Sequence, residues 1–284
     1  MPRVIESLAE LRDAVARLRE KRGRVGFVPT MGNLHRGHLG LVEEAGRRCE
    51  ATVASIFVNP TQFGPGEDFE AYPRSLDADL EGLASVGCDL VWAPPVEVMY
   101  PLDDPFMLRV PAALSDCLCG RSRPGHFDGV ATVVLRLFSQ VQPDLAVFGK
   151  KDFQQLLILR KMARDLSLPV ELVGAPIARE ADGLAMSSRN GYLDAGQRAT
   201  APALHRVLVE TARALAAGED FAVLKERAIE TLESAGFRPD YLEWRSPRNL
   251  APATPGEPGR LFAAAWLGKA RLIDNHPVPQ PPDT

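Results

Sequence analysis

Apolar and polar positions repeat one rhythm along the first 176 residues of the chain. A short run rich in valine and isoleucine ends in a turn of Gly, Pro or Asn, and a longer segment with helical periodicity follows. The rhythm predicts strands over residues 24–28, 52–58, 89–92, 144–148 and 170–173. It predicts helices over residues 5–20, 37–49, 77–86, 129–141 and 153–166.

Strands that alternate with helices of this length imply right-handed crossovers between parallel strands. The predicted fold class is therefore α/β, with a doubly wound, Rossmann-like parallel sheet in residues 1–176. In such sheets ligands bind beyond the carboxyl ends of the strands. Binding and catalytic residues are therefore expected in the loops that follow the strands.

The pattern changes at about residue 178, where a polar loop begins. Helices are predicted over residues 194–217 and 221–235, and extended segments over residues 240–245, 260–266 and 270–273. Residues 177–284 thus form a predicted smaller α+β domain. Three prolines and two glycines in residues 251–259 predict a loop, and the proline-rich tail after His276 is expected to be disordered.

Composition and charge narrow the classes of partner. The chain has 284 residues, 45% of them hydrophobic, which is enough to bury a sizeable core. A formal net charge of −4 gives no broad attraction to nucleic acid, which is not an expected partner. No run approaches the roughly 18 apolar residues that span a bilayer, and residues 1–20 do not resemble a signal peptide. We expect a soluble, cytoplasmic protein without a membrane partner.

The four cysteines indicate reduced thiols. Cys49 and Cys88 lie in apolar segments, where cysteine behaves as a small hydrophobic residue. Cys117 and Cys119 with the nearby His126 are a conceivable metal site, but this set lacks a fourth ligand and the usual spacing. Reduced thiols are the preferred interpretation.

The strongest chemical signal follows the first predicted strand, in the sequence Pro-Thr-Met-Gly-Asn-Leu-His-Arg-Gly-His of residues 29–38. Pro29 and Gly32 end the strand, and apolar periodicity then starts a helix. His35 and His38 fall near the N-terminus of that helix and, being three residues apart, share one face. Unpaired amides at a helix N-terminus favour phosphate, and imidazole donors beside them can stabilise charge on phosphoryl oxygens.

A zinc site is the alternative interpretation of the two histidines. Such sites place histidines at positions i and i+4 with a glutamate between them and a third ligand elsewhere, and this segment has none of these features. Gly37, between the histidines, allows a ligand to approach the backbone closely. The position of the pair after a strand favours phosphate binding.

Two more loops after strands carry polar side chains. Asn59 and Gln62 suit a small hydroxylated acid, although turn chemistry around a proline explains them equally well. Gly149, Lys151 and Asp152 lie between a strand and a helix, where lysine neutralises phosphate and aspartate caps the helix or accepts a ribose hydroxyl. Capping alone explains the aspartate but not the two adjacent lysines.

The remaining candidates are ambiguous from the residues alone. Tyr72 and Asp79 are most simply surface groups, and Arg123 is either a surface charge or an anion contact. The polar loop with Ser187, Ser188 and Arg189 can wrap a triphosphate and close as a lid. A serine-rich linker is the plainer interpretation of that loop.

Taken together, these segments resemble the pantothenate synthetase family within the HxGH nucleotidyltransferase superfamily. The stretch 29–38 resembles the HxGH nucleotide-binding signature of that superfamily. Further matches follow in the same order over residues 58–63, 72–74, 123–130, 148–155 and 186–190. The last of these is similar to the KMSKS-like loop of the superfamily.

The resemblance implies a set of site residues. Those implied as catalytic are His35, His38, Lys151, Ser188 and Arg189. Those implied to bind ATP are Pro29, Thr30, Met31, Gly32, Gly37, Gly149, Lys151, Asp152, Ala178, Met186, Ser187, Ser188 and Arg189. Those implied to bind pantoate are Met31, Asn59, Gln62 and Gln155. Tyr72 and Arg123 are possible additional site residues, and the resemblance implies that the arginine lies near the phosphates. Asp79 is implied to help hold Mg²⁺, although Ala78 stands where some relatives carry aspartate.

The implied activity is ATP-dependent ligation of D-pantoate and β-alanine through a pantoyl adenylate, with release of AMP and pyrophosphate. The resemblance further implies Mg²⁺, a homodimer, a nucleotide-binding domain in residues 1–176 and a lid in residues 177–284. Two alternatives remain open. One is another HxGH-type nucleotidyltransferase, which retains the nucleotide in its product, and the other is a nucleotide-binding module without catalysis.

Overall fold

The computed structural model of the chain describes residues 1–64, 69–70, 72 and 75–279. The chain forms two compact units. The first unit comprises Met1–Val110, Arg123–Lys150 and Gln155–Pro176, and the second comprises Pro111–Ser122, Lys151–Gln154 and the remainder from Ile177. The predicted boundary between residues 176 and 177 takes no account of the two short segments that belong to the second unit.

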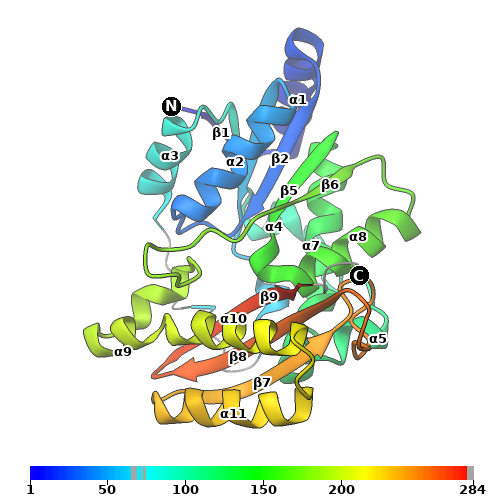
Figure 1. Ribbon diagram of the computed structural model, residues 1–284. Helices are drawn as coiled ribbons and strands as arrows, with labels where there is room; N and C mark the ends of the chain where they lie inside the picture. Colours follow the sequence, from blue (N-terminus) through cyan, green and yellow to red (C-terminus); the bar gives the residue numbers. More distant parts are fainter. Residues whose placement is uncertain (65–68, 71, 73–74, 280–284) are drawn as a thin grey trace. The chain divides into compact units, whose positions relative to one another are not determined.

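The first unit contains a parallel sheet of six strands in the order β1-β4-β3-β2-β5-β6 (Figure 1). The strands are β1 (Arg3–Ile5), β2 (Val25–Thr30), β3 (Ala51–Ile56), β4 (Leu90–Trp92), β5 (Leu145–Gly149) and β6 (Glu171–Ala175). The predicted α/β fold class and its five strands are confirmed. The sequence pattern missed β1, because its three residues are too few to show a period of two.

Helices connect these strands. The longer ones are α1 (Leu8–Arg22), α2 (Arg36–Arg48), α3 (Leu76–Ser85), α7 (His126–Val141) and α8 (Phe153–Asp165). The short ones are α4 (Val96–Met99), α5 (Ala112–Ser115), α6 (Leu118–Ser122), η1 (Pro60–Gln62) and η2 (Lys150–Asp152). The five predicted long helices are confirmed with shifted ends. For example, α1 begins later than predicted because Ser7 is its N-cap, with Oγ accepting the Glu10 amide at 3.3 Å.

Strand order creates a switch point beside β2. From β2 the chain crosses through α2 to β3 on one side, whereas β5 pairs with β2 on the other side. Loops that leave β2 and β5 at their carboxyl ends therefore diverge, which opens the crevice where ligands bind in doubly wound sheets. Both loops belong to the predicted site.

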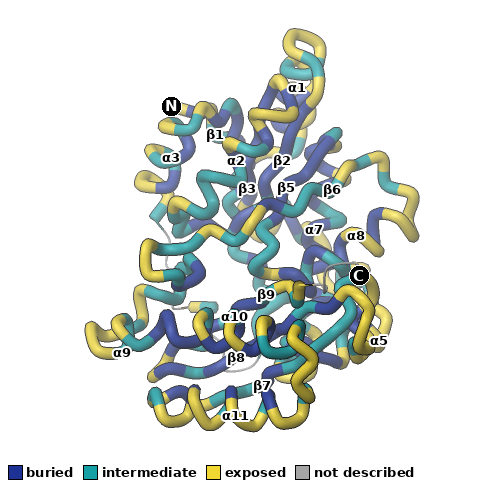
Figure 2. Tube along the Cα trace, in the orientation of Figure 1, coloured by how far each residue is buried: buried dark blue, intermediate teal, exposed yellow. Residues whose placement is uncertain are grey.

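The first core lies between the sheet and its helices. Figure 2 shows β2 and β5 as buried strands, and Val28, Ala54 and Val147 are fully buried. Val42 of α2 and Leu83 of α3 pack into the same cluster. Burial of the valine and leucine side chains, each contributing roughly 1.5–3 kcal/mol, anchors the helix that carries the predicted histidine pair.

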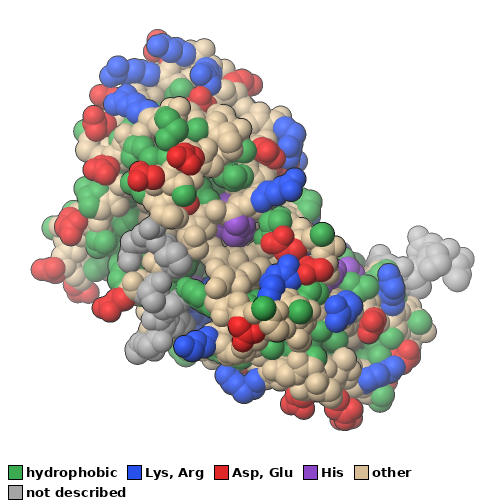
Figure 3. Space-filling view, turned by 90° about the vertical axis from the view of Figure 1, so that its left-hand side faces the viewer, with side chains coloured by type: hydrophobic (Ala, Val, Ile, Leu, Met, Phe, Trp, Pro, Cys, Tyr) green, Lys and Arg blue, Asp and Glu red, His purple; other side chains and the backbone are tan. Residues whose placement is uncertain are grey.

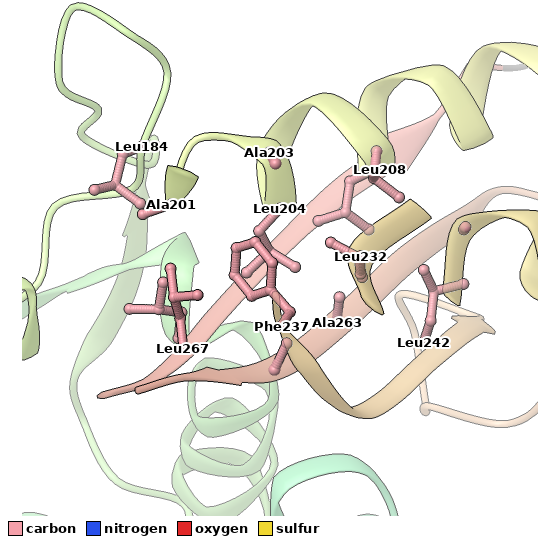
Figure 4. Packing of buried hydrophobic residues seen from close by; sticks show 14 of the residues in the cluster. Leu184, Ala201, Ala203, Leu204, Leu208, Leu232, Phe237, Leu242, Ala263 and Leu267 are labelled. Carbon is pink, nitrogen blue, oxygen red and sulfur yellow. The ribbon is translucent and has the colours of Figure 1, made fainter. Parts of the chain in front are cut away.

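The second unit has an antiparallel sheet in the order β7-β8-β9. Its elements are η3 (Ser188–Tyr192), α9 (Ala195–Thr200), α10 (Ala203–Ala216), α11 (Phe221–Ser234), β7 (Arg238–Arg245), β8 (Gly259–Leu267) and β9 (Ala270–Val278). Figure 4 shows Leu204 and Leu208 of α10, Leu232 of α11 and Ala263 of β8 in one apolar cluster. The smaller α+β part of the predicted fold class is confirmed.

Two predictions for this unit were wrong in detail. The single helix predicted over residues 194–217 is two helices, because Pro202 lacks an amide hydrogen and restricts the residue before it. The tail predicted to be disordered after His276 continues β9, where Pro277 pairs with Arg260. β9 is an edge strand, which tolerates proline. Residues 280–284 of that tail lie outside the described residues, as do Pro73 and Arg74 of the 72–74 motif.

Charged side chains of both signs are intermixed on the face drawn in Figure 3. This distribution agrees with the small net charge of −4. Within the described part of the chain, no helix combines the length and apolar character required to cross a bilayer.

Candidate functional site

The two predicted histidines form a capping pair at the start of α2. His35 is the N-cap, and its Nδ1 accepts the Gly37 amide at 3.1 Å. Nδ1 of His38 accepts the His35 amide at 3.3 Å, and the two rings stack with centroids 4.0 Å apart. Because each Nδ1 accepts a backbone N–H, each neutral ring carries its proton on Nε2. The pair therefore presents Nε2–H donors at the positive end of a helix.

A buried carboxylate holds the loop between β2 and α2. Asp79 is 2% exposed, and its two oxygens accept the amides of Asn33 at 2.9 Å and Leu34 at 2.7 Å. The Ser75 hydroxyl donates to the same carboxylate at 3.3 Å. Gly32 and Asn33 both have positive φ, 81° and 50°, so the loop makes a tight left-handed turn that this carboxylate stabilises.

These contacts bear on the Mg²⁺ ligand expected at Asp79. Mg²⁺ is usually bound through one or two carboxylates together with substrate phosphates and water. Here the carboxylate is buried and already accepts three hydrogen bonds. Among the residues that the structure describes, no group of three or more His, Cys, Asp or Glu side chains could hold a metal ion. The described side chains therefore form no metal site by themselves, and the Mg²⁺ role implied for Asp79 stays a prediction.

The end of β2 is joined to the loop after β3. Thr30 donates its hydroxyl to the Ser55 carbonyl at 2.6 Å and accepts the Gly32 amide at 3.2 Å. The Gln62 amide nitrogen lies 3.1 Å from Sδ of Met31. Residues that the resemblance assigns to ATP and to pantoate are therefore neighbours within the first unit.

The side chain of Asn59 makes most of the hydrogen bonds described for the loop after β3. It is 1% exposed, and its Nδ2 donates to Gln62 Oε1 at 3.1 Å and to the Gly129 carbonyl at 3.3 Å. Its Oδ1 accepts the Tyr100 hydroxyl at 2.8 Å and the Thr61 hydroxyl at 3.0 Å. A buried amide with these partners positions Gln62. The Asx turn considered as the alternative is also present, because Oδ1 accepts the Thr61 amide at 3.4 Å.

The backbone of the same loop is held by Arg123 and by His126, the first residue of α7. His126 donates from Nδ1 to the Gln62 carbonyl at 2.8 Å, and Arg123 Nη2 lies 3.4 Å from that oxygen. Arg123 Nη1 is 2.9 Å from His126 Nε2, which fixes the tautomer of that ring. Arg123 thus has a structural partner within the candidate site. Tyr72 is buried, with its ring 6.0 Å from Phe63.

The second unit holds the other predicted phosphate contacts. Lys151 is half-buried and Asp152 is exposed in η2. The Met186 amide donates to the Ala178 carbonyl at 2.9 Å, which closes the loop that leads to η3. Ser187 is the N-cap of η3, with Oγ accepting the Arg189 amide at 3.3 Å, and Ser188 begins that turn. A pocket of this unit is lined by Lys151, Leu184, Ala185, Ser187, Asn190, Leu204, His205, Leu272, Ile273 and Asp274.

An ion pair lies beneath this loop. Arg179 donates to both oxygens of Asp274, at 2.7 and 2.9 Å, and His205 Nδ1 lies 3.4 Å from the same carboxylate. Burial acts to raise the pKa of Asp274, but His205 and Arg179 outweigh it and hold that pKa below its usual value. Asp274 therefore stays ionised and fixes the start of the loop, since the Arg179 Nη1 atom also donates to the Gly183 carbonyl at 3.0 Å.

The predicted site residues thus fall into one set in each unit. The first unit holds Pro29, Thr30, Met31, Gly32, His35, Gly37, His38, Asn59, Gln62, Tyr72, Asp79, Arg123, Gly149 and Gln155. The second unit holds Lys151, Asp152, Ala178, Met186, Ser187, Ser188 and Arg189. The sequence interpretation missed the positions of Tyr100 and Asp274 and considered His126 only as a metal ligand. Of the three, only His126 lies in one of the quoted motifs.

Comparisons with known proteins agree with these motifs. The family model described as pantoate-beta-alanine ligase matches residues 3–277. The pantothenate synthetase of Pseudomonas aeruginosa strain PAO1 is 56% identical over 275 residues, which cover 95% of this chain and 97% of that protein. The pantothenate synthetase of Azotobacter vinelandii is 54% identical, with the same coverage of 95% and 97%.

Solved structures give the same result. The structure of pantothenate synthetase from Thermus thermophilus has a TM-score of 0.91 and 48% identity, covering 97% of this chain and 99% of that one. The pantoate-β-alanine ligase of Francisella tularensis, solved in complex with β-γ ATP and β-alanine, has a TM-score of 0.82 and 29% identity. Coverage of both chains is 100% in that comparison.

The role of Asp79 can be tested without ligands. We expect Asp79→Asn to lower the free energy of unfolding by about 1–3 kcal/mol in the absence of ATP and Mg²⁺, because an NH₂ group would face a backbone N–H. Asp77→Asn, an exposed carboxylate in the same first turn of α3, is the matched control and should change stability by less than about 0.5 kcal/mol. Urea unfolding measures both variants. Equal stability of the two would contradict the loop-holding role.

The packing of Gly129 against the Asn59 loop gives a second prediction. A Cβ at Gly129 would lie 2.6 Å from the Thr61 carbonyl carbon and 2.8 Å from the Gln62 nitrogen, both backbone atoms. Gly129→Ala should therefore displace Gln62 and raise the KM for pantoate about tenfold or more. Gly40→Ala, where a Cβ meets nothing within 4 Å, should leave it unchanged. An unchanged KM in folded Gly129→Ala protein would show that Gln62 does not depend on this packing.

His276 gives a prediction about pH. Burial lowers the pKa of His276 from its usual 6.5, and nearby His205 and Arg179 lower it further. Because the unfolded chain then binds the proton more tightly, the free energy of unfolding should fall as pH drops below 6.5. His276→Gln should reduce this dependence, with Asp274 and Arg260 unchanged in both proteins. Urea unfolding of both proteins about one pH unit above and below 6.5 measures how their free energies of unfolding change with pH. An equal change in the two proteins would contradict the role of His276.

Proposed function

Because this chain belongs to the pantoate-β-alanine ligase family, it is an ATP-dependent ligase that forms pantothenate, and we propose that the histidine pair of α2 stabilises the first transition state. The supporting observation is the shared tautomer of His35 and His38. Backbone amides bind both Nδ1 atoms, which leaves Nε2–H as the donor of each ring. Donors fixed before the reaction need no reorganisation as phosphate charge develops.

In the first step, a carboxylate oxygen of pantoate attacks the α-phosphorus of ATP. The bond from that phosphorus to the bridging oxygen breaks, and pyrophosphate leaves with the bonding electrons. Negative charge grows on the phosphate oxygens, where His35, His38 and Lys151 stabilise it. No protein nucleophile is needed because pantoate itself attacks, and the protein contributes positioning and electrostatics.

In the second step, the neutral amine of β-alanine attacks the carbonyl carbon of pantoyl adenylate. The carbon–oxygen bond to phosphate breaks, AMP leaves, and the amine loses a proton as the amide forms. The adenylate must be protected from water until this attack. We propose that Ser187, Ser188 and Arg189 bind the phosphates, and that residues 177–284 act as the lid.

The pantoate site is proposed around Gln62, Gln155 and Met31 in the first unit. Gln62 is supported by three anchors, since Asn59 holds its side chain while His126 and Arg123 hold its carbonyl. Asn59 is buried, so we propose that it acts through Gln62. Gly149 and Asp152 are proposed for the ribose of ATP.

Three further proposals rest on the resemblance. Mg²⁺ is proposed to bind the ATP phosphates only, because the Asp79 carboxylate already accepts two backbone amides of the loop between β2 and α2. No reaction step is assigned to the ion. A homodimer is proposed from the family alone. A cytoplasmic location is proposed because ATP is the energy source of the reaction.

Pyrophosphate release from purified protein tests the function. With ATP and Mg²⁺, release should require D-pantoate and should continue over many turnovers only when β-alanine is added. Mass spectrometry should identify free AMP and pantothenate. A product that retains the nucleotide would indicate a nucleotidyltransferase, and ATP binding without pyrophosphate release would indicate a module without catalysis.

His38 variants test the role of the pair. We expect His38→Ala to lower kcat by about 10²- to 10³-fold, because a preorganised donor to the transition state is lost. His38→Asn places an acceptor near the position of Nδ1 and so keeps the cap on the His35 amide, but it removes the Nε2–H. This variant should be as stable as the parent and as inactive as His38→Ala. A near-normal rate in either folded variant would exclude the catalytic role.

A further inference from the structure

We infer that Asn275 on β9 is a positioning residue for Lys151, fixing the backbone from which the lysine side chain reaches the phosphates of ATP. This inference rests on the proposed function of Lys151. It concerns a residue far along the chain that none of the quoted motifs includes, and it belongs entirely to the second unit.

The two faces of the antiparallel sheet contact different parts of the second unit. Successive residues of a strand point to opposite faces. Leu261, Ala263 and Ala265 of β8 point into the apolar cluster with α10 and α11. Arg260 and Phe262 alternate with them and so point to the opposite face, where Phe262 is directly across from Asn275. The second face is therefore available to hold the segment Lys151–Gln154.

Asn275 makes a bond to that segment with its side-chain nitrogen. Its Nδ2 donates to the Lys151 carbonyl at 2.9 Å, while its Oδ1 accepts a short hydrogen bond from Arg260 Nη1. Its own amide donates to Asp274 Oδ1 at 2.7 Å. Asn275 is 2% exposed, so these bonds form in a region of low dielectric, where an unmade bond is costly.

Aromatic packing completes the hold on the segment. The rings of Phe153 and Phe262 meet edge to face at 5.8 Å, and the Arg260 guanidinium lies 4.4 Å from the centre of the Phe153 ring. Burial lowers the pKa of Arg260 to about 10, so the guanidinium is charged near neutral pH. It therefore both orients the Asn275 amide and stacks on the segment that carries Lys151.

The neighbouring Asp274 extends this hold to the second phosphate-binding segment. Asp274 faces α10 and pairs with Arg179, which begins the loop to Ser187. Asn275 thus binds the Lys151 segment on one face of the antiparallel sheet, and Asp274 binds, through Arg179, the loop that leads to Ser187 on the other face. The geometry keeps both at a fixed separation within the second unit.

Positioning matters more for Lys151 than for a rigid side chain. Lysine carries a point charge on a flexible four-carbon stem, so the location of its backbone decides where the ammonium can reach. A displacement of about 1 Å at a catalytic group can cost about 10²-fold in rate. A hydrogen bond to the main-chain carbonyl fixes that location whatever the lysine side chain is doing.

Asn275→Asp is the sharpest test because it keeps the shape and the acceptor for Arg260 but removes the donor to the Lys151 carbonyl. We expect kcat for pantoate-dependent pyrophosphate release to fall about 10- to 100-fold, with little change in the KM for β-alanine. Leu242→Val is the control, since it weakens the apolar core of the same sheet without touching these polar groups. It should retain normal kcat. If Asn275→Asp does not fold, Asn275→Ala replaces it.

A double-mutant cycle separates positioning from a general structural role. In a Lys151→Ala background the effect of Asn275→Asp should disappear, because the group being positioned is gone. Hydrogen exchange gives a readout independent of activity, and amides of residues 152–154 should exchange faster in Asn275→Asp, with α11 unchanged.

Each result decides a separate question. Normal kcat in folded Asn275→Asp, or losses that multiply in the double mutant, would overturn the inference. Unchanged exchange at residues 152–154 would also overturn it. Failure of the parent protein to release pyrophosphate with pantoate would instead count against the proposed function.

Discussion

The turn from β2 into α2 is the constraint on which the first unit depends. Where a helix begins a few residues after a buried strand, several amides at its start have no helical partner. The chain satisfies such amides with three side chains. Asp79 accepts two amides of the turn, His35 accepts the Gly37 amide of the first helical turn, and His38 accepts the amide of the N-cap residue His35. Two of these side chains, His35 and His38, are also the donors that we propose for the phosphates of ATP. The hydrogen bonds that stabilise the turn therefore also orient the two imidazole rings.

Regular alternation of apolar runs and helical segments made most of the first unit predictable. Strands such as β2 and β5 are buried on both faces, so their sequences are short continuous apolar runs that stand out from their surroundings. β1 has only three residues, and its place beside β4 follows from tertiary pairing. Pro202 is a local signal for a helix boundary, but the amphipathic pattern continues across it, and a single helix was therefore predicted where the structure has two.

The candidate site was predictable only where its residues are close in sequence. The spacing of His35 and His38 marks one helical face, and the loop from Ser187 to Arg189 stands out by its polarity. The bond from Asp79 to Asn33 spans 46 residues, and the bond from Asn275 to Lys151 spans 124. No local pattern encodes such distances. The Mg²⁺ role of Asp79 was implied by the resemblance alone, and the bonds from its oxygens to the amides of Asn33 and Leu34 were not indicated by the sequence.

Main-chain anchoring of position 62 has a consequence for protein engineering. His126 and Arg123 hold the carbonyl of Gln62, an atom that every amino acid possesses. Exchange of the side chain at this position leaves that anchor intact, so the loop should keep its course while the group presented to the proposed pantoate site changes. Position 62 is therefore a rational starting point for a ligase that accepts other hydroxy acids. Position 59 is unsuitable, because its buried amide holds the loop together through its side chain.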